Sequence, residues 1–192
     1  MPHYMPVMLN LEGRRCVVVG GGQVAERKAA ALAEAGAKTV IVSPKVTEGL
    51  RRRSLEGAIV WTQREYAEGD LTGAFLAVAA TDRQEVNAAV VAEAGERGIP
   101  VNDAGDGPNG SFITPSVLRR GGLVVAVSTS GAGPAASREL CREIDGHFGH
   151  DYEQYIDFLS SARAFIKNNV TNPGKRKRLF RRLAETDILT SI

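Results

Sequence analysis

The feature that most constrains the fold is a glycine triplet between an apolar run and a helical pattern. The apolar run covers 16–19, Gly20, Gly21 and Gly22 follow it, and Ala25 lies just beyond. This order predicts a strand, a tight turn and a helix. Gly20 can adopt the backbone angles of a sharp exit from a strand, Gly22 lets the main chain approach a phosphate, and Ala25 lets the helix lie close to the strand. The N–H groups of the new helix then suit a pyrophosphate.

The context of the triplet separates a dinucleotide site from a purely structural turn. Apolar residues at helical spacing continue to Ala35, Gly36 lies where a left-handed helix terminus is expected, and a second apolar run covers 39–42. A glycine-rich turn alone occurs in many unrelated loops, but here a strand precedes it and a helix and a second strand follow it. The pattern therefore favours a dinucleotide site over a structural turn.

Strand and helix patterns continue to alternate up to residue 111. The predicted elements are an edge element at 5–11, strands at 58–63, 74–80 and 99–101, and a short helix at 47–55. A further helix is predicted from Asp82, which forms a capping-box pattern with Glu85, to Gly98, with Ala89 on its buried side. Such alternation with short connections predicts an α/β fold with an N-terminal Rossmann-like, doubly wound parallel sheet.

The carboxyl ends of these strands hold the candidate cofactor residues, because ligands of such sheets bind outside those ends. Four separate pieces of sequence should meet there in one crevice. The predicted cofactor-binding residues are Gly20, Gly22, Gln23, Val24, Ser43, Pro44, Lys45, Thr81, Asp82 and Asn102.

The end of the second strand lacks the acidic residue that usually binds the adenosine ribose. Ser43, Pro44 and Lys45 stand there instead. A serine with a nearby lysine also tolerates a 2′-phosphate, so these residues by themselves leave NAD and NADP open.

Two aspartates after the last strand are the candidate catalytic groups. A dehydrogenase must direct a proton while hydride leaves to the nicotinamide, and Asp103 or Asp106 could do this. The alternative is that either carboxylate only bonds its own glycine-rich loop. Ser128 lies in a polar turn before a helix, where a substrate carboxylate could meet helix N–H groups. The sequence has no Tyr-x-x-x-Lys pair, which argues against the short-chain alcohol dehydrogenase mechanism.

The pattern changes after residue 111. Strand-like runs at 112–118 and 123–128 predict a hairpin, and Pro134 suits the first turn of the next helix. This piece is too small to bury both of its faces, so we expect it to pack on a second copy in a homodimer. The expected domains are an NAD-binding Rossmann-like domain (1–111), a small α+β dimerisation region (112–148) and a C-terminal helical domain (149–192).

Composition excludes several classes of protein. The 24 basic and 22 acidic residues give a formal charge of +2, which does not indicate a nucleic-acid partner. Cys16 and Cys141 have neither the number nor the spacing of a disulfide framework or a zinc site, and they are typical of thiols in a reducing compartment. The sequence has no uninterrupted apolar run of about eighteen residues, so we expect a cytoplasmic protein without a membrane partner.

Several motifs in a fixed order extend the argument beyond the glycine turn. They are 20–28, Ala79 to Asp82, Val101-Asn102, Ser111 to Ser116, and Ala126 to Ser128 with Gly131 and Pro134. Together they resemble the siroheme synthase family, specifically its precorrin-2 dehydrogenase module, over almost the whole chain. The chain resembles a stand-alone form of that module, without the methyltransferase domain that some relatives carry.

The resemblance implies NAD-dependent oxidation of precorrin-2 to sirohydrochlorin and, in bifunctional members, insertion of ferrous iron. It also implies a homodimer. The substrate is a polycarboxylate tetrapyrrole, which gives Arg119, Arg120 and the basic segment 175–182 a role in binding carboxylates. The position of the family's functional aspartate falls on Gly105 here, so the resemblance points to the adjacent Asp106 first and to Asp103 second.

Two other functions remain open at the level of sequence. One is a regulatory module that binds NAD to switch a partner, and the other is a tetrapyrrole carrier without turnover. A sensing module commonly uses the acidic ribose contact that is missing here, and it would not need the motifs at 111–116 and Ser128.

Overall fold

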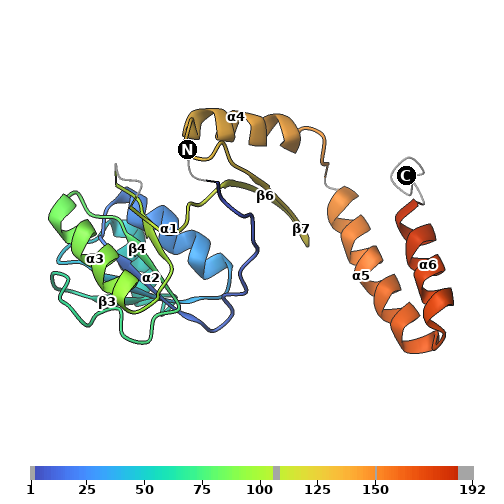
Figure 1. The fold of residues 1–192 in the computed structure, drawn as a ribbon, viewed down its shortest axis with the longest axis horizontal. Helices are drawn as coiled ribbons and strands as arrows, with labels where there is room; N and C mark the ends of the chain where they lie inside the picture. Colours follow the sequence, from blue (N-terminus) through green and yellow to red (C-terminus); the bar gives the residue numbers. More distant parts are fainter. Residues whose placement is uncertain (1–2, 106–108, 150, 186–192) are drawn as a thin grey trace. The chain divides into compact units, whose positions relative to one another are not determined.

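The computed structural model describes residues 3–105, 109–149 and 151–185. They belong to two compact units, Met1–Thr114 and Pro115–Ile192, and Figure 1 shows the order of the elements along the chain. The finer division into domains over 1–111, 112–148 and 149–192 remains a prediction.

The first unit is built on a five-stranded parallel sheet. Its strands are β1 (Arg15–Val19), β2 (Lys38–Val42), β3 (Val60–Thr62), β4 (Leu76–Ala79) and β5 (Val101–Asp103). Their order is β3-β2-β1-β4-β5, so the chain runs outward from β1 and then returns to place β4 on the other side of it. The predicted doubly wound sheet is confirmed, and the change of direction lies between β1 and β4, where such folds bind ligands.

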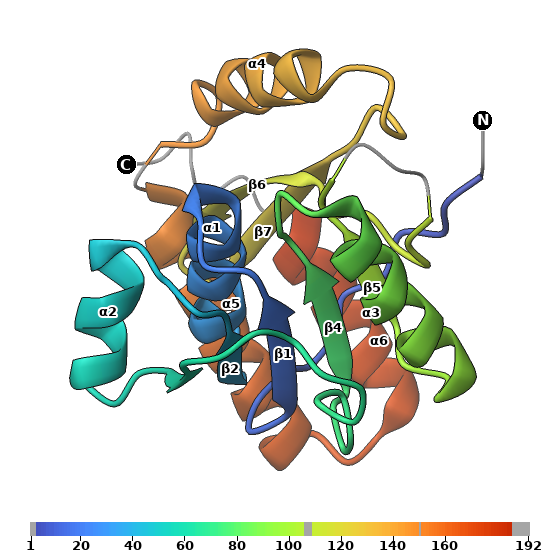
Figure 2. The ribbon, with the colours of Figure 1, turned by 90° about the vertical axis from the view of Figure 1, so that its left-hand side faces the viewer.

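Helices cover both faces of this sheet because β1 is apolar on both faces. Cys16 and Val18 pack into a core with α1 (Gln23–Glu34) and α2 (Glu48–Leu55). Val17 and Val19 pack into a second core with α3 (Gln84–Glu96). Figure 2 shows α1 and α2 on one side of the strands and α3 on the other. Successive residues of a strand point to opposite faces, so one apolar run supplies both cores.

The connection from β3 to β4 is a loop, 63–75, instead of a crossover helix. Tyr66 packs against the core on the α3 side, and its hydroxyl donates a hydrogen bond to Glu93 of α3. The same carboxylate accepts a bond from the Gly69 N–H (3.1 Å) and pairs with Arg97 (2.8 Å). Burial of an unpaired carboxylate would be costly, so these three partners explain why α3 tolerates a buried glutamate.

The second unit contains the predicted hairpin and three helices. Strands β6 (Ser116–Arg120) and β7 (Leu123–Val127) pair antiparallel across a two-residue glycine turn. The helices are α4 (Pro134–Asp145), α5 (Asp151–Asn169) and α6 (Pro173–Glu185), and Pro134 lies in the first turn of α4, as predicted.

Three local predictions were wrong. Residues 5–11 form no strand, so the sheet has no extra edge element from this lead-in. Asp82 does not cap α3, whose N-cap is Arg83 without a side-chain hydrogen bond. Ala89 is exposed, whereas Asn87 and Glu93 are buried, because their polar side chains bond to the neighbouring loops.

Candidate functional site

A crevice of about 570 Å³ lies at the carboxyl ends of the strands in the first unit. Of the predicted cofactor residues, it is lined by Gly20, Gly22, Ser43, Pro44, Lys45, Thr81 and Asp82. Gln23, Val24 and Asn102 do not line it. Among the lining residues that the sequence prediction did not include, Glu65 and Tyr66 come from the loop after β3, and Arg83 and Val86 come from the N-terminal end of α3.

The three glycines of the turn meet different surroundings. Gly20 has φ +125°, and a Cβ there would lie 2.2 Å from the Ala80 carbonyl oxygen. At Gly21, a Cβ would lie 1.9 Å from the carbonyl oxygen of Lys45, but at Gly22 it would meet nothing within 4 Å. Gly20 therefore makes the turn, Gly21 lets the turn pack against the end of β2, and Gly22 faces open space that a ligand can use.

The start of α1 offers donors to that space. Gly22 is the N-cap and supplies no side-chain hydrogen bond, so it leaves the first-turn N–H groups without a side-chain acceptor. Ala25 is fully buried against the sheet, as predicted from its small size. Uncapped N–H groups beside an open glycine fit a pyrophosphate, because the helix dipole also favours an anion there.

The end of β2 is held by hydrogen bonds from side chains to its backbone carbonyl oxygens. The Ser43 hydroxyl donates to the Lys45 carbonyl oxygen (2.7 Å), and the Trp61 indole N–H donates to the Ser43 carbonyl oxygen (2.9 Å). Ser43 is buried, whereas Lys45 is exposed. The turn that usually carries the ribose-binding acid is therefore rigid and contains no carboxylate.

The end of β4 depends on Asn87, which the sequence prediction did not include. Its side-chain oxygen accepts bonds from the Thr81 N–H (3.1 Å) and the Thr81 hydroxyl (2.7 Å), and its amide donates to the Thr81 carbonyl oxygen (3.1 Å). Asn87 is only 5% exposed. The available signal was an amide beside the apolar residues of a helix face that is largely buried. The hydrogen bonds of Asn87 fix the turn at Thr81, which lines the crevice.

Asn102 ties β5 to the chain that follows it. Its amide donates to the Phe112 carbonyl oxygen (3.1 Å), and the Ser111 hydroxyl accepts from the Val101 N–H (2.8 Å). The Asn102 side-chain oxygen is buried without a hydrogen-bond partner among the described residues. The contacts of Asn102 therefore support a structural role in placing the segment that leaves the sheet.

Of the two candidate catalytic aspartates, the structure describes only Asp103. Asp103 accepts a bond from the Gly105 N–H (3.0 Å), which is the local loop contact that the sequence left open as an alternative. Asp106 lies outside the described residues.

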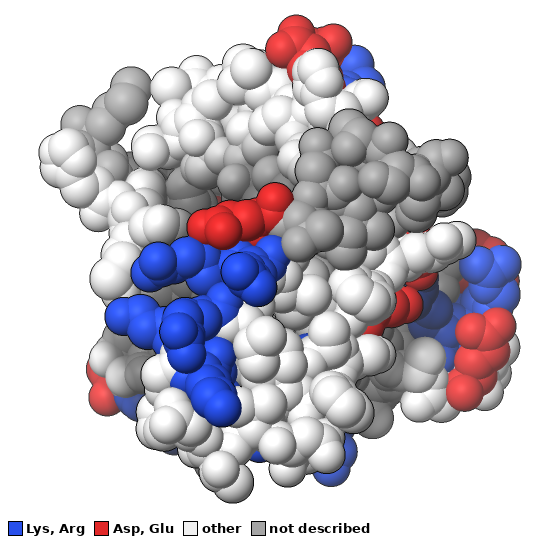
Figure 3. All heavy atoms as spheres, turned by 90° about the vertical axis from the view of Figure 1, so that its right-hand side faces the viewer, with Lys and Arg blue, Asp and Glu red and all other residues white. Residues whose placement is uncertain are grey.

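The candidate substrate residues belong to the second unit. Ser128 is exposed, and its hydroxyl accepts a bond from the Ser130 N–H (3.1 Å). Arg120 is already engaged, since its guanidinium pairs with Asp145 and donates to the Phe148 carbonyl oxygen (3.3 Å), whereas the Arg119 side chain is exposed. Figure 3, viewed from the side of α6, shows a cluster of Lys and Arg side chains, and α6 carries six basic residues.

Comparison with family models identifies the first unit. Residues 7–116 match the model described as "Putative NAD(P)-binding". The chain belongs to this family. The match covers the glycine turn, all strands of the parallel sheet and the crevice, so the predicted dinucleotide class of the cofactor is confirmed.

Relatives extend the similarity to the second unit and confirm the resemblance to siroheme synthases. The chain is 37% identical to siroheme synthase 1 of Aeromonas salmonicida over 97% of its own length and 33% identical to a siroheme synthase of Nitrosococcus oceani over 98%. It spans about 40% of the length of these proteins. A solved structure, SirC, precorrin-2 dehydrogenase, matches with a TM-score of 0.80 and 29% identity, covering 94% of this chain and 89% of that one.

None of the helices within the described ranges is long and apolar enough to cross a membrane.

Proposed function

We propose that the protein is an NAD-dependent dehydrogenase that oxidises precorrin-2 to sirohydrochlorin. The observation that carries this proposal is the dinucleotide crevice in a chain whose fold matches a precorrin-2 dehydrogenase over 94% of its length. The siroheme synthases that share the same region support the same substrate class.

In this proposal the chain holds the dinucleotide by its pyrophosphate. The N-terminus of α1 receives the phosphates over Gly22, and the Ala25 contact keeps the helix close to β1. A bound nicotinamide would supply the acceptor for a hydride from the substrate, and a base of this chain would take the proton. We assign proton transfer to Asp106, to which the family resemblance points first; Asp103, the second candidate, accepts a bond from its own loop.

The substrate would be recognised through its carboxylates in the second unit. Arg119 is exposed, and Ser128 is exposed in the turn between β7 and α4, so both can meet an acidic side chain of a tetrapyrrole. Arg120 was predicted to share this role, but its pairing with Asp145 supports a role in holding the hairpin to the end of α4.

The homodimer expected from the sequence is part of the proposal. In the part of the second unit that the structure describes, Leu118 is the one buried hydrophobic residue, whereas Val117 and Leu140 are 46% and 44% exposed. These exposed apolar residues, in a unit with so little apolar burial of its own, support the proposal that a second copy covers them. A monomeric mass by light scattering at micromolar concentration would contradict the dimer.

A cytoplasmic location also remains a proposal. It rests on the cysteines, which are both unpaired. Burial raises the pKa of the Cys16 thiol to about 11, which keeps it in the unreactive protonated form.

The deciding experiment follows NADH formation and the tetrapyrrole spectrum when the protein is mixed with precorrin-2 and NAD. We expect both signals to change together. Binding of NAD without turnover would instead favour a sensing module or a carrier. Asp106→Asn should abolish turnover but not NAD binding, whereas Asp103→Asn should retain turnover, and the opposite result would reverse the assignment.

Insertion of ferrous iron is a separate prediction from the family resemblance. It is tested by mixing the protein with sirohydrochlorin and ferrous iron and following the absorption change. An unchanged spectrum, compared with the uncatalysed mixture, would limit the activity to dehydrogenation.

A further inference from the structure

The crevice contains a carboxylate that the end of β2 lacks. Glu65 lines the crevice from the loop after β3, and β3 pairs with β2 in parallel. The Ser43 N–H donates to the Thr62 carbonyl oxygen (3.2 Å), so the ends of these two strands lie side by side. The loop after β3 therefore delivers Glu65 to the neighbourhood where Rossmann folds usually place the ribose-binding acid.

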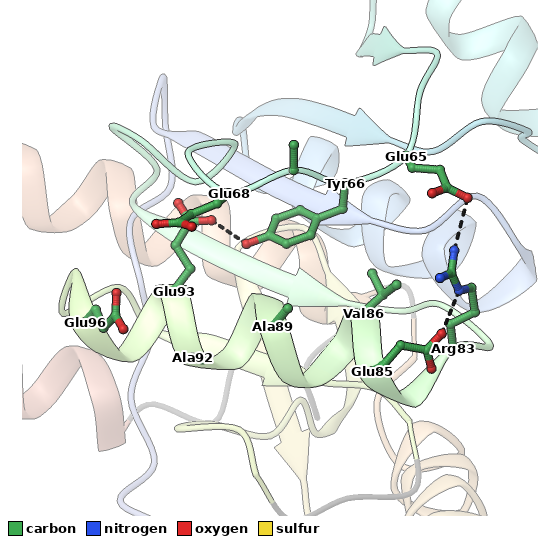
Figure 4. Close-up of a pocket in the computed structure, with 11 residues that line it drawn as sticks. Glu65, Tyr66, Glu68, Arg83, Glu85, Val86, Ala89, Ala92, Glu93 and Glu96 are labelled. Carbon is green, nitrogen blue, oxygen red and sulfur yellow. Dashed lines mark hydrogen bonds and ion pairs between the residues drawn. The ribbon is translucent and has the colours of Figure 1, made fainter.

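Glu65 is paired with an arginine that lines the same crevice. The Arg83 Nη1 atom lies 3.0 Å from Glu65 Oε1, and the Arg83 Nε atom lies 2.9 Å from Glu85 Oε1 (Figure 4). The two carboxylates raise the pKa of Arg83, and Arg83 lowers the pKa of Glu85. Two acidic partners from two elements thus hold one guanidinium at the edge of the crevice.

Glu65, Arg83 and Glu85 lie between the crevice and a second cavity. Glu65 and Arg83 line both the crevice and an adjacent cavity of about 490 Å³, whereas Glu85 lines only the adjacent cavity. The charged residues that line the crevice are Lys45, Glu65, Asp82 and Arg83. Lys45 and Arg83 favour a 2′-phosphate by their charge, whereas Glu65 and Asp82 disfavour one.

We propose that Glu65 serves as the ribose-binding acid and, by holding Arg83 together with Glu85, selects NAD over NADP. This inference rests on the proposed function, because it concerns the same cofactor crevice. The Glu65 side chain is 70% exposed, and exposed ion pairs are weak, so its carboxylate can turn from Arg83 to the hydroxyls of an adenosine ribose. The same negative charge repels a 2′-phosphate.

The test measures dissociation constants of NAD and NADP by calorimetry for the full chain at one ionic strength. Glu65→Gln should weaken NAD and strengthen NADP, which shifts the ratio of the two constants by about tenfold or more. Adding Arg83→Ala to Glu65→Gln should remove the gain for NADP. Glu68→Gln is the matched control, because Glu68 lines the adjacent cavity but not the crevice, and it should leave the ratio unchanged.

Separate outcomes distinguish this inference from the proposed function. If the native chain binds neither dinucleotide, both fail. If it binds NAD and oxidises precorrin-2 but Glu65→Gln leaves the NAD to NADP ratio unchanged, only the assignment of Glu65 is overturned. Thermal unfolding of each variant, monitored by circular dichroism, must match the native chain for the ratio to be compared.

Discussion

At the scale of single residues, neighbouring glycines of the turn have different physical roles. Gly21 packs against the backbone of Lys45, and the Gly21 carbonyl oxygen accepts a hydrogen bond from the Thr47 N–H (2.9 Å). Gly22 faces open space at the start of α1. The first therefore supports the fold and the second leaves room for the ligand.

The two glycines should respond differently to alanine. Gly21→Ala forces a Cβ to within 1.9 Å of a carbonyl oxygen and should lower the free energy of unfolding by about 2 kcal/mol or more, measured by urea titration. Gly22→Ala should leave stability almost unchanged but weaken dinucleotide binding, because its Cβ would occupy phosphate space. Equal losses of stability in both variants would contradict this division.

At the scale of elements, the loop 63–75 takes the place of a crossover helix, and side-chain hydrogen bonds hold its conformation. Arg64 holds Asp70 with two hydrogen bonds, at 2.7 Å to Oδ2 and 2.5 Å to Oδ1, and the Ala67 N–H donates to the same carboxylate (2.9 Å). Glu93 ties the loop to α3 through Tyr66 and Gly69. These contacts keep Glu65 and Tyr66 at the rim of the crevice.

The Asp70 contact predicts a dependence of stability on pH. Its hydrogen bond with Arg64 lowers the pKa of Asp70 below the ordinary value of 3.8. A depressed carboxyl pKa stabilises the fold above the unfolded value, and this stability is lost as the pH falls through the folded value. The difference in unfolding free energy between the native chain and Asp70→Asn should therefore shrink from pH 6 to pH 3, and a constant difference would contradict this role.

Glu93 gives a second test of the loop. Glu93→Ala leaves the Tyr66 hydroxyl and the Gly69 N–H without their acceptor, which should cost about 2 kcal/mol of unfolding free energy. Glu96→Ala, an exposed change on the same helix, should cost far less. Similar costs for the two changes would show that the loop does not depend on Glu93.

At the scale of the whole molecule, buried apolar residues are unevenly distributed. Both hydrophobic cores lie within residues 11–112, whereas the described part of the second unit buries only Leu118 among its hydrophobic residues. Hydrophobic burial is the main favourable term in folding, so the first unit has its own source of stability.

A fragment of residues 1–114 should therefore fold alone, unfold in one cooperative transition and bind NAD with the affinity of the full chain. It keeps Thr114, which accepts a hydrogen bond from the Lys28 ammonium. Thermal unfolding and calorimetry check this prediction. A fragment without native circular dichroism, or without NAD binding, would show that the first unit requires the second.

Local sequence patterns were sufficient for the strand, turn and helix around Gly20, for the parallel sheet and for the hairpin after residue 111. These features follow from short-range backbone sterics and from the period of apolar residues, which a linear sequence displays directly. The capping box at Asp82 failed because α3 begins at Gln84 with Arg83 as its N-cap, and the polar contact at this end is the bond between Thr81 and Asn87.

The sequence by itself determined that the chain has a dinucleotide turn, a doubly wound sheet and an NAD(P)-binding first unit. The tertiary structure alone decided that Gly21 meets Lys45, that Arg120 pairs with Asp145, and that Glu65 and Arg83 meet at the crevice. The physical reason is that each of these contacts joins residues from different elements. Their distance in space depends on the path of the folded chain, which no local pattern records.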